Sequence, residues 1–129
     1  MTPISTREAP EAIGPYSQAI MANGVIYTSG QIALMPNGTM ETGDVEQQTH
    51  QVMKNLFHVL KEAGAQFNDV MKCTIYLSDM NDFETVNRVY AHYFDTHKPA
   101  RSTIAVKSLP KNALVEIECI ALANPDYTF

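Results

Sequence analysis

The stretch Pro99-Ala-Arg-Ser-Thr-Ile-Ala-Val106 and the later run Leu114-Val-Glu-Ile-Glu-Cys-Ile-Ala121 decide the fold that we expect for this sequence. Both runs are rich in β-branched residues, and the segment between them contains a proline. This is the usual pattern of two strands joined by a turn. We therefore predict a β-hairpin over residues 99–121.

The alternation of side chains along this hairpin predicts one polar face and one apolar face. Because successive side chains of a strand point to opposite faces, Arg101 and Thr103 are expected together on one face. Glu116 and Glu118 alternate with apolar residues in the second run and are expected on the same face of the hairpin. Such a face is usually solvated surface. The residues alone also leave open a structural salt bridge between Arg101 and one of the glutamates.

Length and composition favour one globular domain over residues 1–129, with 45% hydrophobic and 18% charged residues. A net charge of -5 and scattered basic residues argue against nucleic acid as the main partner. No apolar stretch approaches the ~20 residues that a membrane span needs, and the first residues lack the pattern of a signal peptide. We therefore expect a cytoplasmic protein with no membrane partner.

The N-terminal half of the chain carries further turn signals. Residues 1–15 are polar and contain three prolines, which indicates an extended lead-in. Asn23-Gly24 lies between two β-rich runs and is a strong hairpin signal, because both turn positions need positive φ. A second turn at residues 36–38 is expected to precede a short strand at residues 39–40.

Two helices and one more strand complete the expected elements. The first helix is expected to begin after Asp44, a good N-cap, and to end at Gly64. Residues 70–77 alternate as a strand does, and Asn81 and Glu84 predict a capping box at the start of a second helix. This order favours an α/β (α+β) fold with one mixed sheet and both helices on one face. The other face, where we expect the polar residues of the hairpin, would be covered by oligomerisation, and a pocket could form at that interface.

Metal and cofactor sites find no support in the sequence. The histidines and cysteines do not follow ligand spacing, and the glycines form no phosphate-binding loop. Cys73 and Cys119 fall in predicted strands, where inert, reduced core thiols are expected. Arg101 could hold a carboxylate by two parallel hydrogen bonds, and a nearby glutamate could take a proton from water. A hydrolase acting on a small carboxylic acid needs these parts and no metal.

The sequence resembles the Rid family of reactive-intermediate deaminases, also called the YjgF family. The resemblance extends over about residues 7–123, in family order and at family spacing. It is carried by six motifs, Ala12-Ile-Gly-Pro-Tyr-Ser-Gln-Ala19, Thr28-Ser-Gly-Gln-Ile32, Asn81-Asp-Phe-Glu-Thr-Val-Asn87, Pro99-Ala-Arg-Ser-Thr103, Leu109-Pro-Lys111 and Val115-Glu-Ile-Glu118.

The resemblance implies a chorismate-mutase-like fold, assembled as a homotrimer with a central barrel and three pockets at the subunit interfaces. It implies hydrolysis of 2-imino and enamino acids, such as 2-iminobutanoate and 2-iminopropanoate, to 2-oxoacids and ammonia. These imines are released by pyridoxal-phosphate enzymes, and their removal limits metabolite damage. No cofactor is implied. Other activities attached to the family are small-molecule-binding regulator, stress-activated chaperone and endoribonuclease or translation inhibitor.

The same resemblance implies seven site residues. Arg101 would hold the substrate carboxylate, and Glu116 would position the attacking water, with Glu118 left to the interface or its hydrogen-bond network. The remaining residues that would line the pocket are Tyr16, Ser29, Gly30, Asn87 and Thr103.

Overall fold

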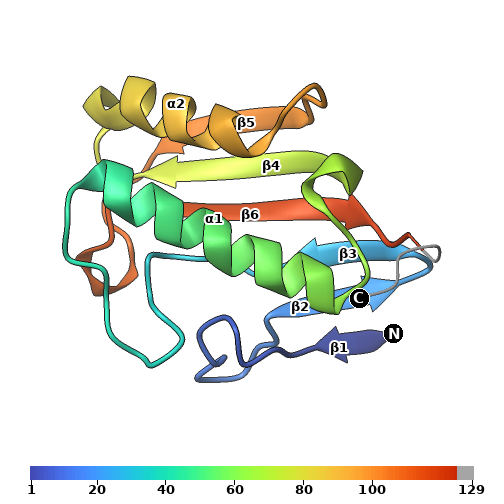
Figure 1. Ribbon diagram of the computed structural model, residues 1–129. Helices are drawn as coiled ribbons and strands as arrows, with labels where there is room; N and C mark the ends of the chain where they lie inside the picture. The colour runs from blue at the N-terminus through green and yellow to red at the C-terminus, as the bar shows by residue number, and fades with distance from the viewer. Residues whose placement is uncertain (125–129) are drawn as a thin grey trace.

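The computed structural model describes residues 1–124 as one six-stranded sheet with both helices on the same face (Figure 1). The strand order is β1-β2-β3-β6-β4-β5. The bounds are β1 Thr2–Ile4, β2 Ala19–Ala22, β3 Val25–Thr28, β4 Val70–Leu77, β5 Ala100–Ala105 and β6 Val115–Leu122. The predicted mixed sheet covered by two helices is confirmed. The last five residues of the predicted 1–129 domain lie outside the described residues.

Helix α1 (Val45–Glu62) begins and ends where the sequence predicts. The Asp44 side chain accepts a hydrogen bond from the backbone N–H of Gln47 at 2.9 Å. The Gln47 side chain accepts one from the backbone N–H of Asp44 at 3.1 Å, which completes a capping box. Gly64 follows the helix with a φ of 86°, a conformation that glycine adopts without a steric penalty.

Helix α2 (Phe83–Tyr93) begins differently from the prediction. A single 3₁₀ turn, η2 (Met80–Asp82), precedes it, and the Asp79 side chain caps this turn by accepting from the N–H of Asn81 at 2.9 Å. The predicted capping box between Asn81 and Glu84 is therefore wrong, because Asp79 provides the acceptor two residues earlier.

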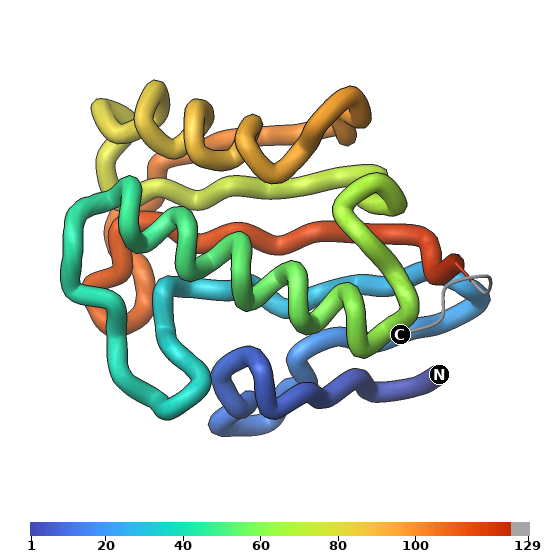
Figure 2. Tube along the Cα trace, viewed as in Figure 1, coloured from blue at the N-terminus to red at the C-terminus, as the bar shows by residue number. Residues whose placement is uncertain are grey.

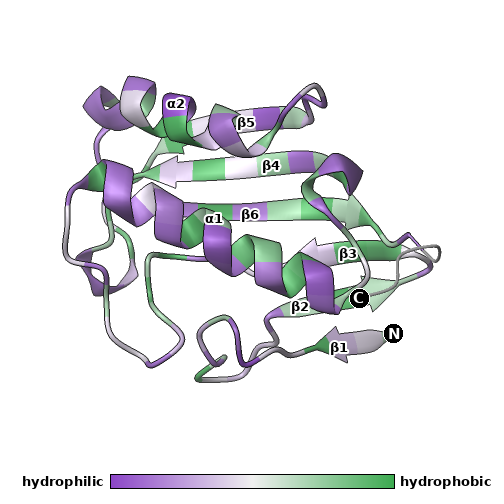
Figure 3. Cartoon of the chain, viewed as in Figure 1, coloured by the Kyte–Doolittle hydropathy of each residue, from purple (hydrophilic) through white to green (hydrophobic). Residues whose placement is uncertain are grey.

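The core lies between the helices and the sheet, and the strands alternate in hydropathy to match it (Figure 3). Along β6, and along β4 from Cys73 onward, every second residue is buried against the helices. Complete burial of one large aliphatic side chain contributes about 1.5–3 kcal/mol. The fully buried large side chains are Ile26, Val52, Met53, Leu56, Val59, Leu60, Val70, Ile75, Leu77, Val86, Val115 and Ile117.

The predicted hairpin of β5 and β6 is wrong, because β4 lies between these two strands. β4 pairs with β5 in parallel and with β6 in antiparallel orientation. Strand β5 follows α2, and a strand–helix–strand crossover returns the second strand parallel to the first. β5 thus becomes an edge strand beneath α2, as Figure 2 shows.

This topology also overturns the predicted common polar face. Residues paired across neighbouring strands carry their side chains on the same face. Arg101 pairs with Cys73 and Thr103 pairs with Ile75, whose side chains point toward the helices. Glu116 and Glu118 pair with Tyr76 and Thr74 on the opposite face. The two-residue period of the strands is as predicted. The position of β5 beside β4, however, places Arg101 and Thr103 on the helix-facing side of the sheet.

The face of the sheet that lacks helices carries several apolar side chains. Tyr27, Ile104 and Leu122 are about half exposed there, at 49%, 46% and 50%. Two smaller predictions also differ from the structure. The extended lead-in contains β1, which pairs with β2, and the short strand predicted at residues 39–40 is a single bridge between Leu34 and Met40. Within residues 1–124, no helix is long and apolar enough to cross a membrane.

Candidate functional site

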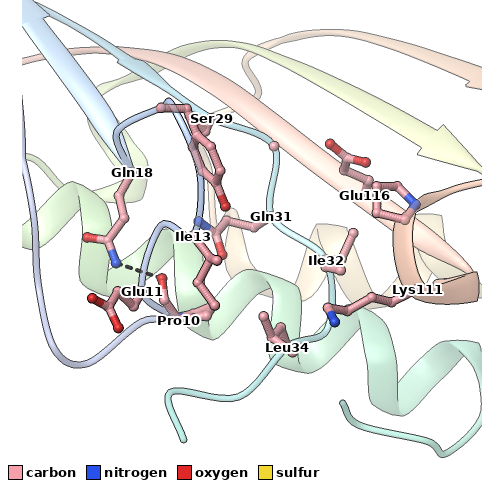
Figure 4. Close-up of a pocket in the computed structure, with 13 residues that line it drawn as sticks. Pro10, Glu11, Ile13, Gln18, Ser29, Gln31, Ile32, Leu34, Lys111 and Glu116 are labelled. Atoms are coloured by element: carbon pink, nitrogen blue, oxygen red, sulfur yellow. Dashed lines mark hydrogen bonds between the residues drawn. The ribbon is translucent and has the colours of Figure 1, made fainter. Parts of the chain in front are cut away.

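Four of the seven predicted site residues line one cavity of about 570 Å³, which we call the Glu116 pocket (Figure 4). They come from the segment before β2, the segment after β3, and β6. Glu116 and Lys111 lie on one side of the cavity in Figure 4, and Pro10, Glu11 and Gln18 lie on the other. The complete lining is Pro10, Glu11, Ile13, Tyr16, Gln18, Ser29, Gly30, Gln31, Ile32, Leu34, Pro110, Lys111 and Glu116.

The segment after β3 is held tightly against β6 beside Glu116. Gln31 exchanges backbone hydrogen bonds with Ile117, at 2.9 and 3.1 Å. The Ser29 hydroxyl donates to the Ser17 carbonyl at 2.5 Å. A β-carbon on Gly30 would overlap the Glu116 carboxylate. Glycine at this position therefore allows the carboxylate to lie against the backbone.

Gln18, which sequence reasoning did not single out, builds one wall of the pocket. Its side chain is buried, accepts from the N–H of Thr6 at 2.7 Å, and donates to the carbonyls of Thr6 and Pro10 at 3.1 and 2.8 Å. These bonds hold residues 6–10 against the start of β2. The only sequence signal for this role was its place inside the motif of residues 12–19.

The chemistry of the Glu116 pocket centres on one perturbed carboxyl group. Burial raises the pKa of Glu116, and the charge of Glu118 raises it further. A glutamate with a raised pKa is a better proton acceptor at neutral pH than an ordinary one. Lys111 adds a cation to the lining, from a loop in which Lys111 and Asn112 have φ values of 55° and 56°.

The predicted residues Asn87 and Arg101 line a second cavity, which we call the Arg101 site, and Thr103 lies two residues from Arg101 on the same face of β5. Nη1 of Arg101 donates to Oδ1 of Asn87 at 2.6 Å. The guanidinium carbon lies 5.7 Å from the ring centre of Phe83 and 5.2 Å from that of Tyr90. Cation–π contacts at these distances hold the guanidinium without using its other donors.

Two buried hydroxyls of the Arg101 site lack a hydrogen-bond partner among residues 1–124, those of Tyr90 and Thr103. Buried polar atoms usually have a partner, so the Thr103 hydroxyl is available to a ligand, whereas the Tyr90 hydroxyl lies beside the Cys73 thiol. The cavity beside Arg101 measures about 400 Å³. Phe83 and Tyr90 were not among the predicted site residues, because aromatic residues at helical spacing are the usual signature of a core.

The Arg101 site and the Glu116 pocket lie on different faces of the sheet, so one chain does not bring them together. Among the described residues, Arg101 forms no ion pair, and the ion pair that is present joins Arg88 to Glu46 at 2.8 Å, between α2 and α1. A structural salt bridge from Arg101 to Glu116 or Glu118 is thereby excluded within one chain. No group of three potential metal ligands occurs among residues 1–124.

Comparison with known proteins identifies the family. The family model described as Endoribonuclease L-PSP matches residues 6–123. The chain is 50% identical over 123 residues to 2-iminobutanoate/2-iminopropanoate deaminase of Mus musculus, covering 95% of this chain and 91% of that protein. This chain belongs to the Rid (YjgF) family. It is also 52% identical over 119 residues to Reactive Intermediate Deaminase A, chloroplastic, of Arabidopsis thaliana. That alignment covers 92% of this chain and 64% of the length of the Arabidopsis protein.

A solved structure extends the comparison of this Rid protein to three dimensions. The crystal structure of E. coli TdcF with bound serine superimposes with a TM-score of 0.91 at 38% identity, covering 96% of this chain and all of that chain. The chorismate-mutase-like fold expected from the resemblance is thereby confirmed. The trimer and the roles of individual site residues stay predictions.

Proposed function

We propose that this Rid protein hydrolyses 2-imino acids to 2-oxoacids and ammonia, without a cofactor. The observation that carries the proposal is the Arg101 guanidinium, which is exposed, fixed by Asn87 and two rings, and free of any carboxylate partner among residues 1–124. A planar guanidinium with unused donors matches a carboxylate by two parallel hydrogen bonds. The naming of the mouse relative as a 2-iminobutanoate/2-iminopropanoate deaminase supports the same substrate class.

We further propose that the complete site forms between two copies of the chain in a homotrimer. The Arg101 site of one copy would face the Glu116 pocket of the next. Two observations support this arrangement: the two half-sites lie on different faces of one sheet, and the face without helices exposes Tyr27, Ile104 and Leu122. An uncovered apolar sheet face is commonly buried by association with further copies.

In the proposed reaction, the protein orients the substrate and a water molecule and accepts a proton. Arg101 holds the substrate carboxylate, and Glu116 takes a proton from a water whose oxygen bonds to the electrophilic imine carbon. In the protonated imine, the C=N electron pair moves onto nitrogen as the C–O bond forms, which gives a neutral amino alcohol. Glu116 then returns its proton to the nitrogen, the C–N bond breaks, and ammonia leaves as the hydroxyl proton passes to Glu116 and the C=O bond forms. The Thr103 hydroxyl, which has no partner among residues 1–124, lies two residues from Arg101 on the same face of β5 and would donate a hydrogen bond to the bound acid. Tyr16, Ser29 and Gly30 complete the wall on the Glu116 side.

The test is a coupled assay in which a threonine dehydratase generates the imine and 2-oxobutanoate formation is followed. We expect the wild-type protein to speed 2-oxobutanoate formation above the spontaneous rate, and Arg101→Ala to abolish the effect. Arg88→Ala is the matched control, because Arg88 is exposed on α2 but pairs with Glu46 away from the site. It should retain the wild-type rate. Wild-type protein that leaves the spontaneous rate unchanged would refute the proposal.

The other names attached to the family find less support in this chain. The family model is described as an endoribonuclease, but the net charge of -5 disfavours binding of a polyanion. The regulator and chaperone alternatives stay predictions, as does the limitation of metabolite damage. A cytoplasmic location also stays a prediction, since the Arabidopsis relative is named as chloroplastic.

A further inference from the structure

A row of four polar or sulfur-containing residues crosses the otherwise apolar, helix-facing side of the sheet. Cys119 on β6 pairs with Cys73 on β4, and Cys73 pairs with Arg101 on β5. On the other side, the Thr28 hydroxyl at the end of β3 lies 3.8 Å from the Cys119 sulfur and accepts from the Cys119 N–H at 2.9 Å. The proposed hydrolysis uses neither thiol. The row therefore places two unused, oxidisable groups beside Arg101.

The backbone pairing places these two cysteines directly opposite each other on neighbouring strands, at a separation that a disulfide can span. The Cys119 N–H points to β3, and the Ser78 N–H donates to the Leu114 carbonyl across β4 and β6. Hydrogen-bonded and non-hydrogen-bonded pairs alternate along antiparallel strands. Ser78 and Leu114 are a hydrogen-bonded pair, so Cys73 and Cys119, five pairs further along, are a non-hydrogen-bonded pair. In such pairs the Cα atoms lie about 4.5 Å apart and the side chains are close. Disulfides span Cα separations of about 4.4–6.8 Å, so a bond needs no rearrangement of the strands.

The two thiols differ in their readiness to ionise. The pKa of Cys73 is lowered most strongly by the hydrogen bond between its thiol and that of Cys119. The Tyr90 hydroxyl and the positive charges of Arg101 and Lys72 lower it further, and together these effects outweigh burial. The same interaction with Cys73 raises the pKa of Cys119, and burial adds to it. A thiolate is the nucleophilic form of cysteine, so Cys73 is the thiol suited to attack and Cys119 the one suited to resolve.

We propose that Cys73 and Cys119 are a reversible modification site that closes a cross-strand disulfide on reaction with a hydroperoxide. The Cys73 sulfur attacks one peroxide oxygen, the O–O bond breaks, and a sulfenic acid and water or an alcohol form. The Cys119 sulfur then attacks the sulfenic sulfur, the S–S bond forms, and the oxygen leaves as water with the Cys119 proton. Two electrons pass from the two thiols to the peroxide, and a thiol reductant returns them.

The position of the pair decides which oxidants reach it. Cys73 and Cys119 are only 2% and 3% exposed. Cys73 is flanked by Tyr90 and Arg101, which line the cavity of the Arg101 site. Transient release of the Arg101 side chain from Asn87 and the two rings would open this route to a molecule as small as hydrogen peroxide. A bulky disulfide such as oxidised glutathione does not fit the route and should react far more slowly.

The test follows both thiols in the full-length protein. Reduced protein is treated with hydrogen peroxide, unfolded in the presence of an alkylating reagent, and weighed intact by mass spectrometry. We expect protein that has lost two hydrogen atoms and takes no alkyl group, stays monomeric on a non-reducing gel, and regains both thiols with dithiothreitol. Two alkylated thiols after prolonged peroxide treatment, or disulfides between chains, would overturn the proposal.

Two variants assign the order of reaction. Cys119→Ala leaves Cys73 without a resolving thiol, so a sulfenic acid should persist there and take a dimedone label. Cys73→Ala leaves Cys119 alone, and we expect at least tenfold less label on it. Labelling in the reverse order would overturn the assigned roles. Circular dichroism of each variant checks that the fold is kept, and the wild-type result stands without the variants.

A carboxylate ligand provides a separate test of the route past Arg101, and this part rests on the proposed function. If 2-oxobutanoate holds the Arg101 side chain in place, it should slow disulfide formation several-fold. If 2-oxobutanoate demonstrably binds and the rate of disulfide formation does not change, the route past Arg101 is refuted. Oxidation without any imine hydrolysis by the reduced protein would instead refute the deaminase proposal and leave the disulfide site standing.

Discussion

A mixing experiment tests whether the functional site is shared between two chains. Arg101→Ala removes a bidentate contact to the substrate carboxylate, and Glu116→Gln removes the proton acceptor. A hydrogen bond to a charged group contributes about 1.5–3 kcal/mol, and each 1.36 kcal/mol is tenfold in rate. The loss of Arg101 should therefore lower kcat/KM on the order of 100-fold. Glu116→Gln should cost a similar factor, since general-base catalysis typically contributes about 10²–10⁴-fold.

The two inactive variants should restore activity when they assemble together. Arg101 and Glu116 lie on different faces of the sheet, so in a closed ring each interface takes Arg101 from one chain and Glu116 from the next. With random assembly of equal amounts, half of the interfaces receive an intact Arg101, and half of those receive an intact Glu116. About a quarter of the sites should then be complete. The mixture should show about a quarter of the wild-type rate in the coupled dehydratase assay.

The refolded or co-expressed mixture needs one matched control. Arg101→Ala mixed with the double variant Arg101→Ala/Glu116→Gln contains no interface with an intact arginine, and should stay at the level of Arg101→Ala alone. Native mass spectrometry verifies that chains of both kinds share assemblies. Mixed assemblies that show no recovery would refute the shared site, because they would mean that each chain must supply both residues itself.

Three further substitutions probe the two half-sites. Asn87→Ala removes the 2.6 Å hydrogen bond that holds Arg101, so we expect kcat/KM to fall roughly fivefold, for about 1 kcal/mol, with the thermal midpoint unchanged in calorimetry. Gly30→Ala places a β-carbon on the Glu116 carboxylate; turnover should fall by at least tenfold while circular dichroism stays that of the wild type. Glu116 acts as a carboxylate, so activity is lost as the pH falls through its raised pKa, at a higher pH than for an ordinary glutamate near 4.3. Glu118→Gln removes one cause of the shift and should move this acid limb of the pH–rate profile to lower pH; a limb that does not move would show that burial alone sets the pKa.

Local signals in the sequence predicted local structure well. Asn23-Gly24 forms the hairpin turn of β2 and β3 with φ values of 52° and 76°, and Asp44 caps α1 as expected. These features depend on residues a few positions apart, whose preferences hold in most folds. The start of α2 shows the limit even of local signals. Asp79 and Asn81 are both good caps, and only the path of the chain decided between them.

Long-range features could not be read from the pattern. The alternation in β5 gives the period of a strand, but the face that each residue takes depends on which strands lie beside it. The insertion of β4 between β5 and β6 therefore moved Arg101 away from Glu116. Membership of the candidate site came from the resemblance, whereas Gln18 and Lys111 carried no signal of their own. A buried glutamine that ties down a loop looks, in sequence, like any polar residue near a strand.

The two consecutive left-handed residues beside the Glu116 pocket also bear on local unfolding. Lys111 and Asn112 have φ values of 55° and 56° without being glycine, and such conformations cost of order 1–3 kcal/mol each. The backbone amides of Asn112 and Ala113 are held by hydrogen bonds of 3.2 and 3.0 Å to the carbonyls of Leu109 and Pro110. Relief of the strain favours transient opening of this loop, so these amides should exchange with deuterium well before those of β6. The entrance to the pocket would then open and close on a faster timescale than the sheet that supports it.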